Sequence, residues 1–295
     1  MRIGLLGTGP WAGWVHAPAL AAHPGVEFAG VWGRRPEAAA EIAAAHGVPV
    51  FDDPAALIDA VDAVSIALPP AVQAGYAVRA AEAGRHLLLD KPVATCAADA
   101  RAVAAAVRKT SVASVVFFTL RFAGEQSGWL AEQAALGGWF TARCDWLGSV
   151  FTTDSPYAAS PWRREKGALW DVGPHALAML LPALGDVERV TAADGPGDTV
   201  HLVLRHGSGA SSSVTLSLTA PPAAAVDGVG LELRGEHGVT RMPARDEHPV
   251  VAFGRALDAL ASAAGGGGAH PCDVAFGTRV VEILAEAEAA LRIGH

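Results

Sequence analysis

The sequence contains few cysteines and no long apolar run. Its three cysteines, Cys96, Cys144 and Cys272, lie far apart without a Cys-x-x-Cys pair, so neither a disulfide framework nor a thiolate zinc site is indicated. Apolar runs such as residues 112–118 and 176–184 are much shorter than the ~20 residues that a membrane-spanning helix needs. Glycine and proline interrupt the N-terminal apolar stretch before it resembles an export signal. We therefore expect a cytoplasmic protein.

Positive charge is also scarce. The chain has 22 lysines and arginines against 30 acidic residues, which gives a net charge of −8 and a pI near 5.7. This balance argues against a general nucleic-acid or anionic-membrane surface, so any phosphate-binding site must be local. With 295 residues, 51% of them hydrophobic, the chain is long enough for one large core, and we expect two.

The first ~115 residues alternate short β-branched runs with alanine-rich stretches, a pattern typical of βαβ units on a parallel sheet. Gly47 and Gly84 are expected to end two helices, and Asp53-Pro54 to begin another. The expected strands are residues 3–6, 26–32, 63–68, 86–89 and 112–119. The expected helices include residues 37–46, 71–83 and 99–109.

Beyond residue 120 the strand-like stretches are longer and indicate a mostly antiparallel sheet with a hairpin turn at residues 207–209. These strands are expected at residues 141–150, 189–193, 199–205, 211–219 and 229–234. Helices near residues 174–184, 250–264 and 273–291 are expected to cover one face of this sheet, which gives an α+β domain.

A glycine-rich turn directly follows the first expected strand. Its sequence is Gly7-Thr8-Gly9-Pro10-Trp11-Ala12. Glycines in such a turn let a pyrophosphate approach backbone N–H groups, and the positive end of the next helix reinforces the attraction. The position after a strand predicts a dinucleotide site, although such a pattern is often only a turn. Pro18 is expected to delay or kink the helix that follows.

The end of the second expected strand bears on which dinucleotide binds. A carboxylate there would bind the adenosine ribose of NAD, but the chain instead has Gly33, Arg34 and Arg35. Two guanidinium groups can pair with a 2′-phosphate, so NADP is favoured over NAD. The alternatives are that the arginines form a solvated surface pair, or that Glu37 reaches the ribose.

A lysine follows the expected strand at residues 86–89, where ligands of open α/β folds bind. The chain has only three lysines, Lys91, Lys109 and Lys166, and otherwise uses arginine. An ammonium group near an oxidised nicotinamide can lose a proton, whereas a guanidinium cannot. Lys91 is therefore a candidate catalytic group, with a solvated loop residue as the alternative.

Several motifs together resemble one enzyme family. After the glycine turn come Ala67-Leu68-Pro69-Pro70, Gly84-Arg85-His86, Asp90-Lys91-Pro92, Trp162-Arg163 and Asp171-Val172-Gly173-Pro174-His175. In this order they resemble the glucose-fructose oxidoreductase, inositol dehydrogenase and rhizopine-catabolism (Gfo/Idh/MocA) family across essentially the whole chain.

This resemblance implies two domains and an activity. Residues 1–119 would form a Rossmann domain with a doubly wound parallel sheet. Residues 120–295 would form the α+β domain, with an open-faced sheet that binds substrate and joins copies into a homodimer or homotetramer. The implied activity is NAD(P)-dependent oxidation or reduction at a carbinol or carbonyl carbon, commonly of a sugar or cyclitol.

The resemblance also implies a catalytic trio of Lys91, Asp171 and His175. Histidine titrates near neutral pH, so His175 is assigned the exchange of the hydroxyl proton, and Lys91 would bind the same oxygen, although these two roles can be exchanged. Asp171 would orient the substrate or the histidine. Without the resemblance, an Asp and a His four residues apart on a helix are more often a surface pair than a catalytic one.

Further positions follow from the motifs. The residues expected at the cofactor are Gly7, Thr8, Gly9, Pro10, Trp11, Gly33, Arg34, Arg35, Leu68, Pro69, Gln73, Asp90 and Lys91. Trp162 is a candidate wall of the substrate pocket and Arg163 a candidate ligand of an anion or hydroxyl. Core packing of Trp162 and a surface ion pair of Arg163 are the alternatives.

The chain departs from the family pattern at several of its positions. Asp90 replaces the usual glutamate, Gln73 replaces a histidine, and Ala178 replaces an aspartate. The glycine-rich stretch before Asp171 is reduced to residues 166–168. These changes keep the trio and weaken the expectation of a polyol substrate.

Two other functions remain open at this point, a non-catalytic NAD(P)-binding sensor and an NAD-assisted lyase or glycosidase. The retained trio counts against a sensor, because a sensor does not need all three groups. A lyase would oxidise its substrate only transiently and hold its cofactor tightly. The remaining histidines show no spacing typical of a metal site, and we expect none; they include His16, His23, His201, His206 and His270.

Overall fold

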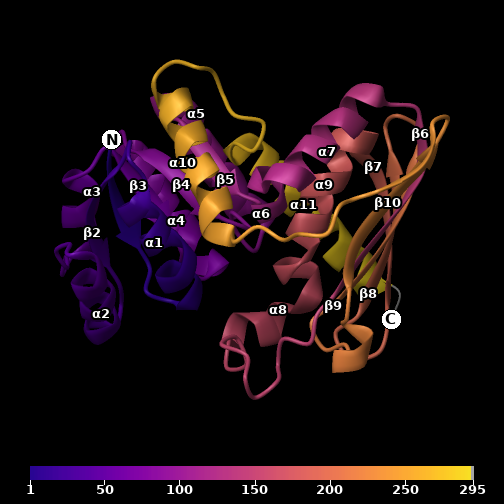
Figure 1. Ribbon diagram of the computed structural model, residues 1–295, viewed down its shortest axis with the longest axis horizontal. Coiled ribbons are helices and arrows are strands. Elements are labelled where there is room, and N and C mark those ends of the chain that lie inside the picture. The colour runs from indigo at the N-terminus through magenta and orange to yellow at the C-terminus, as the bar shows by residue number, and fades with distance from the viewer. Residues whose placement is uncertain (294–295) are drawn as a thin grey trace. The chain divides into compact units, whose positions relative to one another are not determined.

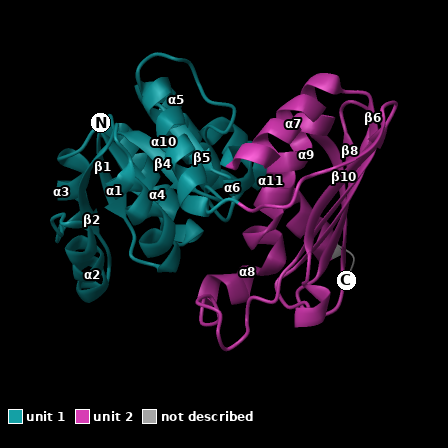
Figure 2. Ribbon diagram, in the orientation of Figure 1, with its two compact units in different colours: residues 1–122, 247–281 teal, residues 123–246, 282–295 magenta. Residues whose placement is uncertain are grey.

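The computed structural model describes residues 1–293 and divides into two compact units (Figures 1 and 2). The first unit comprises residues 1–122 and 247–281. The second comprises residues 123–246 and the chain from residue 282 onward. The chain therefore returns to the first unit after completing most of the second.

The first unit is built on a five-stranded sheet in the order β2-β1-β3-β4-β5. Its strands are β1 (Arg2–Leu6), β2 (Glu27–Trp32), β3 (Ala63–Ile66), β4 (His86–Asp90) and β5 (Ser114–Phe117). Every neighbouring pair is parallel, and the strand interiors are buried and mostly apolar, as expected when helices cover both faces. The predicted parallel, doubly wound sheet is confirmed.

The strand order creates a crevice beside β1. The chain passes from β1 to β2 on one side, and then crosses to β3, β4 and β5 on the other. Right-handed crossovers in opposite directions place their helices on opposite faces, which leaves an opening at the carboxyl ends of β1 and β3. The turns that follow these two strands are therefore the expected ligand-binding segments.

Helices of the first unit begin and end near the predicted residues. Gly47, with a φ of 67°, ends one helix in the left-handed conformation, and the Asp53 side chain caps another through the Ala55 N–H. The helices are α1 (Ala17–Ala22), α2 (Pro36–His46), α3 (Pro54–Asp59), α4 (Pro70–Glu82), α5 (Ala97–Thr110), α6 (Thr119–Phe122) and α10 (Pro249–Ala264).

The expected delay of the first helix by Pro18 is not observed, because the helix begins at residue 10 and continues past Pro18 to Ala22. A π-helical segment, η1 (Ala12–His16), precedes α1, and the Ala17 N–H bonds to the Ala12 carbonyl five residues earlier. Proline has no N–H to donate, so the wider π turn lets the helix continue past Pro18.

Helix α10 does not cover the second sheet, so that expectation is wrong. It packs in the first unit against α1, β4 and β5. Its buried face includes Phe253, whose ring centroid lies 4.8 Å from that of Phe117 and 4.3 Å from that of His16. The sequence pattern shows that this helix has one apolar face, but it does not show which sheet that face meets.

The second unit contains a six-stranded sheet in the order β11-β10-β6-β9-β8-β7. Its strands are β6 (Trp139–Leu147), β7 (Val187–Asp194), β8 (Val200–His206), β9 (Ser211–Ser217), β10 (Val229–Gly235) and β11 (Gly238–Arg241). All pairs are antiparallel except β6 with β9, so the predicted mostly antiparallel sheet is confirmed.

One face of this second sheet is covered and the other is open. Along β8, Leu202 and Leu204 are buried while Val203 and Arg205 are exposed. Helices α8 (Pro161–Asp171) and α9 (Gly173–Leu184) contact β9, and α7 (Gly124–Leu136) packs on α9. A short 3₁₀ segment, η2 (Pro222–Ala224), precedes β10, and α11 (Val274–Ile293) runs from the first unit into the second.

Helices α7 and α8, strand β11 and the 3₁₀ segment η2 of the second unit were not predicted. Helix α8 contains a non-helical residue, Gly167, with a φ of 64°, which interrupts its sequence pattern. Within residues 1–293, no helix combines the length and the apolar character required to cross a bilayer.

His16 lies in the core of the first unit. Its ring is fully buried, and Nδ1 hydrogen-bonds to the Ser65 hydroxyl at 2.8 Å. Burial lowers the pKa of His16 from 6.5 to about 3, because the protonated ring would lose its hydration. Between about pH 3 and pH 6.5, His16 therefore carries a proton in the unfolded chain but not in the folded chain.

We therefore predict that His16 makes the protein sensitive to acid. As the pH falls below 6.5, this residue should lower the free energy of unfolding by ~1.4 kcal/mol per pH unit. The His16→Asn variant should lose that part of the pH dependence, as measured by urea unfolding at about pH 6 and about pH 5. His237 is exposed, so the His237→Asn variant is the control and should keep this pH dependence. An equal change of the unfolding free energy with pH in both variants would contradict the prediction.

Candidate active site

The turn after β1 can approach β3 closely because residue 7 is glycine. Gly7 has a φ of 134°, and a Cβ atom there would lie 2.3 Å from the carbonyl oxygen of Ala67. Its N–H donates to the Trp32 carbonyl of β2, and the Ala67 N–H donates to the Leu6 carbonyl of β1. The ends of three neighbouring strands are thus held together at this point.

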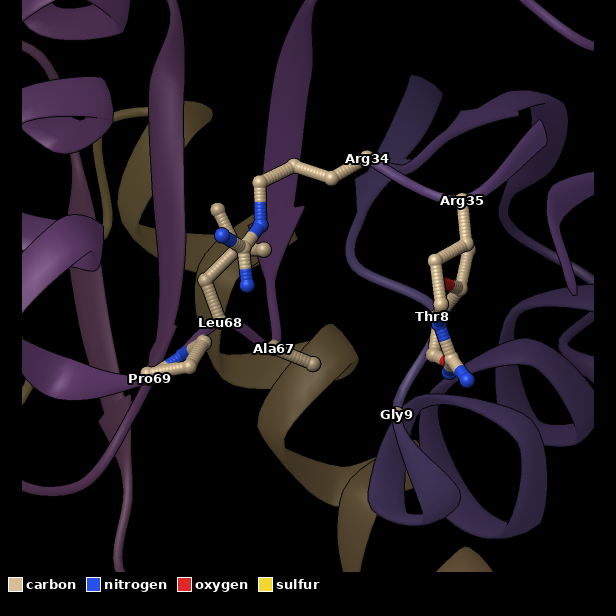
Figure 3. A pocket seen from close by; sticks show the side chains of 7 residues that line it. All are labelled: Thr8, Gly9, Arg34, Arg35, Ala67, Leu68 and Pro69. Carbon is tan, nitrogen blue, oxygen red and sulfur yellow. The ribbon is translucent and has the colours of Figure 1, made fainter. Parts of the chain in front are cut away.

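A cleft of about 490 Å³ opens beside this turn (Figure 3). Its lining comes from the segments that follow β1, β2 and β3, at the crevice that the strand order creates. The lining residues are Thr8, Gly9, Arg34, Arg35, Ala67, Leu68 and Pro69. All of these except Ala67 were expected at the cofactor. Gly33, which was also expected there, does not line the cleft but packs closely against Thr8, because a Cβ at residue 33 would be 2.3 Å from the Thr8 Cγ2.

The charge of the cleft comes from two exposed arginines. Nη2 of Arg35 donates to the Thr8 carbonyl at 3.1 Å, which ties this side chain to the glycine turn. Figure 3 shows the Arg34 side chain extending toward Leu68. None of the seven lining residues carries a carboxylate, so the cleft fits a ligand with negative charge.

The remaining residues expected at the cofactor lie nearby in the chain but outside the lining. Pro10 is exposed and Trp11 is half-buried at the start of the helix that follows the turn. Gln73 is buried on the first turn of α4, where its Nε2 donates to the carbonyls of Asp90 and Pro92. A contact of these residues with a cofactor stays a prediction.

Lys91 follows β4 at the same edge of the sheet as the cleft. Ile66 of β3 pairs with Leu89 of β4, so the segments after these residues emerge side by side. The Lys91 N–H donates to the Asp90 carboxylate at 2.9 Å, and the peptide bond from Lys91 to Pro92 is cis. The lysine is half-buried, not a fully solvated loop residue.

Asp171 and His175 lie where α8 ends and α9 begins. Pro174 stands at the start of α9, which puts His175 in its first turn as predicted. The His175 ring stacks on the Trp146 ring, with centroids 4.7 Å apart and planes at 15°. Trp146 was not predicted as a site residue, because nothing in its spacing distinguishes it from the other tryptophans of the chain.

Arg163 is an ion-pair partner of Asp171. Its Nε donates to Oδ2 of Asp171 at 2.8 Å, and the two side chains are 17% and 8% exposed. The guanidinium also lies over the rings of Tyr157 and Trp162, 4.2 and 4.6 Å from their centroids. Arg163 therefore forms an ion pair, but a nearly buried one and not the surface pair given as the alternative, and its contact with a substrate stays a prediction.

The expected trio is divided between the two units. Lys91 belongs to the first unit, and Asp171 and His175 belong to the second. Their convergence on one substrate stays a prediction. In the part of the chain that the structure describes, no cluster of histidine, cysteine, aspartate or glutamate could hold a metal ion.

The sheet order, the glycine turn and the cleft define a dinucleotide-binding protein of the Rossmann class. Residues 1–118 match the oxidoreductase family with an NAD-binding Rossmann fold (GFO_IDH_MocA), and residues 130–241 match the Gfo/Idh/MocA C-terminal domain. The chain belongs to this family.

Two named dehydrogenases are among the relatives of this chain. Over 228 residues the chain is 27% identical to 4-carboxy-2-hydroxymuconate-6-semialdehyde dehydrogenase of a Sphingobium species. This match covers 74% of this chain and 72% of that protein. Over 215 residues it is 30% identical to levoglucosan dehydrogenase of Pseudarthrobacter phenanthrenivorans. The second match covers 65% of this chain and only 53% of that protein, about half its length.

Solved structures confirm the fold. The WlbA dehydrogenase from Bordetella pertussis, solved with NADH and UDP-GlcNAcA, superposes with a TM-score of 0.86 at 22% identity. The match covers 100% of this chain and 96% of that one. At this identity the likeness concerns the fold.

Two glycines of the turn provide a matched test of the cleft. A Cβ at Gly9 has nothing within 4 Å, so Gly9→Ala should keep the melting temperature while its methyl group enters the cleft. We expect it to weaken NADPH or NADH binding by about tenfold or more in fluorescence titrations. Gly7→Ala should instead lower the melting temperature, because its Cβ would clash with Ala67. Unchanged cofactor affinity in a folded Gly9→Ala protein would argue against the cleft as the binding site.

Proposed function

We propose that the protein is an NAD(P)-dependent dehydrogenase or reductase, with NADP the favoured cofactor, acting on a carbinol or carbonyl carbon of a sugar-like or other polar small molecule. The observation that carries this proposal is the placement of Lys91 and the arginine-lined cleft at one edge of the parallel sheet. Membership of the Gfo/Idh/MocA oxidoreductase family supports it, as do the names of the two relatives.

The cofactor would fit the cleft from the glycine turn to Pro69. Gly9 leaves open space for a close approach of phosphate to the backbone, and the two arginines supply positive charge. Bound there, the nicotinamide would supply the hydride acceptor or donor. Arg34 is the proposed ligand of a 2′-phosphate, because Arg35 already donates to Thr8.

The chain's own residues would handle the substrate oxygen and its proton. Lys91 would donate a hydrogen bond to this oxygen and stabilise negative charge on it, while His175 exchanges the hydroxyl proton. The two proton-transfer roles can also be exchanged between Lys91 and His175. Stacking on Trp146 holds the imidazole by its face, so the plane of the ring is set before a substrate binds.

Asp171 would orient the histidine or the substrate. Its carboxylate is buried and held by Arg163, so its direction is set before a substrate binds. In this proposal Arg163 acts through Asp171, and Trp162 supports the guanidinium from its ring face.

We also propose that copies of the chain associate through the open face of the second sheet into a homodimer or homotetramer. The exposed Val203, 56% accessible, lies on this face together with exposed polar side chains of β6 and β10. An apolar side chain on an uncovered face favours burial against a second copy.

Replacing the two proton-handling groups tests the proposed chemistry. Lys91→Met and His175→Ala should each lower kcat by about a hundredfold or more with cofactor affinity nearly unchanged, because both side chains act on the reacting oxygen. The assay is NADPH oxidation with the best substrate from a screen of sugar-derived and other polar carbonyl compounds. Lys109→Met changes an exposed lysine of α5 and should be neutral. Turnover at the wild-type rate in both site variants would end the proposal.

Cofactor preference tests Arg34 separately. Arg34→Ala should weaken NADPH binding by about tenfold to a hundredfold and NADH binding much less, because charge-assisted hydrogen bonds to the 2′-phosphate are lost. Fluorescence titration with both reduced cofactors measures this difference. Arg108→Ala, at an exposed position of α5, is the control. Equal losses for the two cofactors would remove the 2′-phosphate assignment.

A further inference from the structure

A buried glutamine bridges the two carbonyls on either side of Lys91. Gln73 is 1% exposed, and its Nε2 donates to the carbonyl of Asp90 at 2.7 Å and to that of Pro92 at 3.0 Å. The residue between these two acceptors is Lys91. The Lys91 N–H is held as well, by the Asp90 carboxylate. The backbone is therefore fixed on both sides of the lysine.

The chemistry of the site determines how this amide is oriented. Two carbonyl oxygens face the same atom of Gln73, and only the amide nitrogen has two hydrogens to donate. The other amide atom, Oε1, is buried and has no hydrogen-bond partner among the described residues. A glutamine here leaves an unsatisfied acceptor that an apolar side chain would avoid. Its contribution to the protein therefore lies in the two hydrogen bonds that it donates.

The same residue connects the lysine with the cleft. Gln73 lies on the first turn of α4, and its own N–H donates to the carbonyl of Pro69, which lines the cleft. One residue thus bonds to the cleft wall through its backbone and to the Lys91 turn through its side chain. Gln73 thus adds a second connection between the cleft wall and the lysine backbone, besides the pairing of β3 with β4.

We infer that Gln73 is a positioning residue that holds Lys91 for its reaction with the substrate oxygen. This inference rests on the proposed function of Lys91. Gln73 does not contact the substrate in this scheme; it acts through the lysine, because displacement of a catalytic group by a fraction of an ångström lowers the rate without preventing binding.

The test compares three substitutions at position 73 in the full-length protein. Gln73→Leu removes both donated hydrogen bonds, and Gln73→Glu keeps the shape but faces the two carbonyls with oxygen. Both should lower kcat by about tenfold or more, with little change in KM and in NADPH affinity. Gln73→His restores a ring N–H donor and should recover a substantial part of kcat. If Gln73→Leu does not fold, Gln73→Glu and Gln73→His still provide the comparison.

A matched control exists elsewhere in the chain. Gln126 is also 1% exposed, and its Nε2 donates to two backbone carbonyls, those of Pro243 and Ala244. Gln126→Leu should lower the melting temperature about as much as Gln73→Leu but leave kcat unchanged. A fall in kcat that follows stability alone would appear in both variants and would overturn the inference.

Combination with Lys91→Met shows whether Gln73 acts through the lysine. In the Lys91→Met background, Gln73→Leu should cause no further loss of the residual turnover, whereas independent effects would multiply and contradict the inference. A Gln73→Leu protein with wild-type kcat, beside an inactive Lys91→Met protein, would overturn only this inference. Wild-type turnover by Lys91→Met would instead overturn the proposed function. If Lys91→Met leaves no measurable turnover, recovery of kcat by Gln73→His decides, and its absence would overturn the inference.

Discussion

The close approach of the turn after β1 to the end of β3 is the constraint on which the cleft depends. Only a residue without a Cβ fits between Leu6 and Thr8, because the Ala67 carbonyl occupies the space that a side chain would need. This contact brings the segments after β1 and β3 together at the point where the strand order reverses. The arginines after β2 then complete the wall, because β2 lies on the other side of β1.

The candidate catalytic groups share one physical feature, which is that neighbouring groups restrict each of them before any substrate binds. The Gln73 side-chain amide donates to the carbonyls of Asp90 and Pro92, and the Lys91 N–H donates to the Asp90 carboxylate, which together hold the turn at Lys91. Stacking on Trp146 limits rotation of the His175 ring, and the guanidinium of Arg163 orients Asp171. Such preorganisation reduces the reorientation that each group would need during a reaction.

Local patterns predicted the first unit well and the supporting residues poorly. The alternation of β-branched runs with capped helices depends on neighbours in the chain, so the strands and helix ends were found within a few residues. Helix α10 was assigned to the wrong sheet, because an apolar helix face carries no information about its partner. Arg163 could bind an anion or a carboxylate by its chemistry alone, and only folding put Asp171 beside it.

The sequence by itself determined the parallel sheet, the glycine turn, the mostly antiparallel second sheet and the family, because each is encoded by residues close together or by motifs in a set order. The tertiary structure decided that Gln73 bridges the backbone around Lys91 and that Trp146 stacks on His175. These contacts join residues 17 to 29 positions apart, as the residue numbers show. Their partners are set by how helices and strands pack, which no local spacing records.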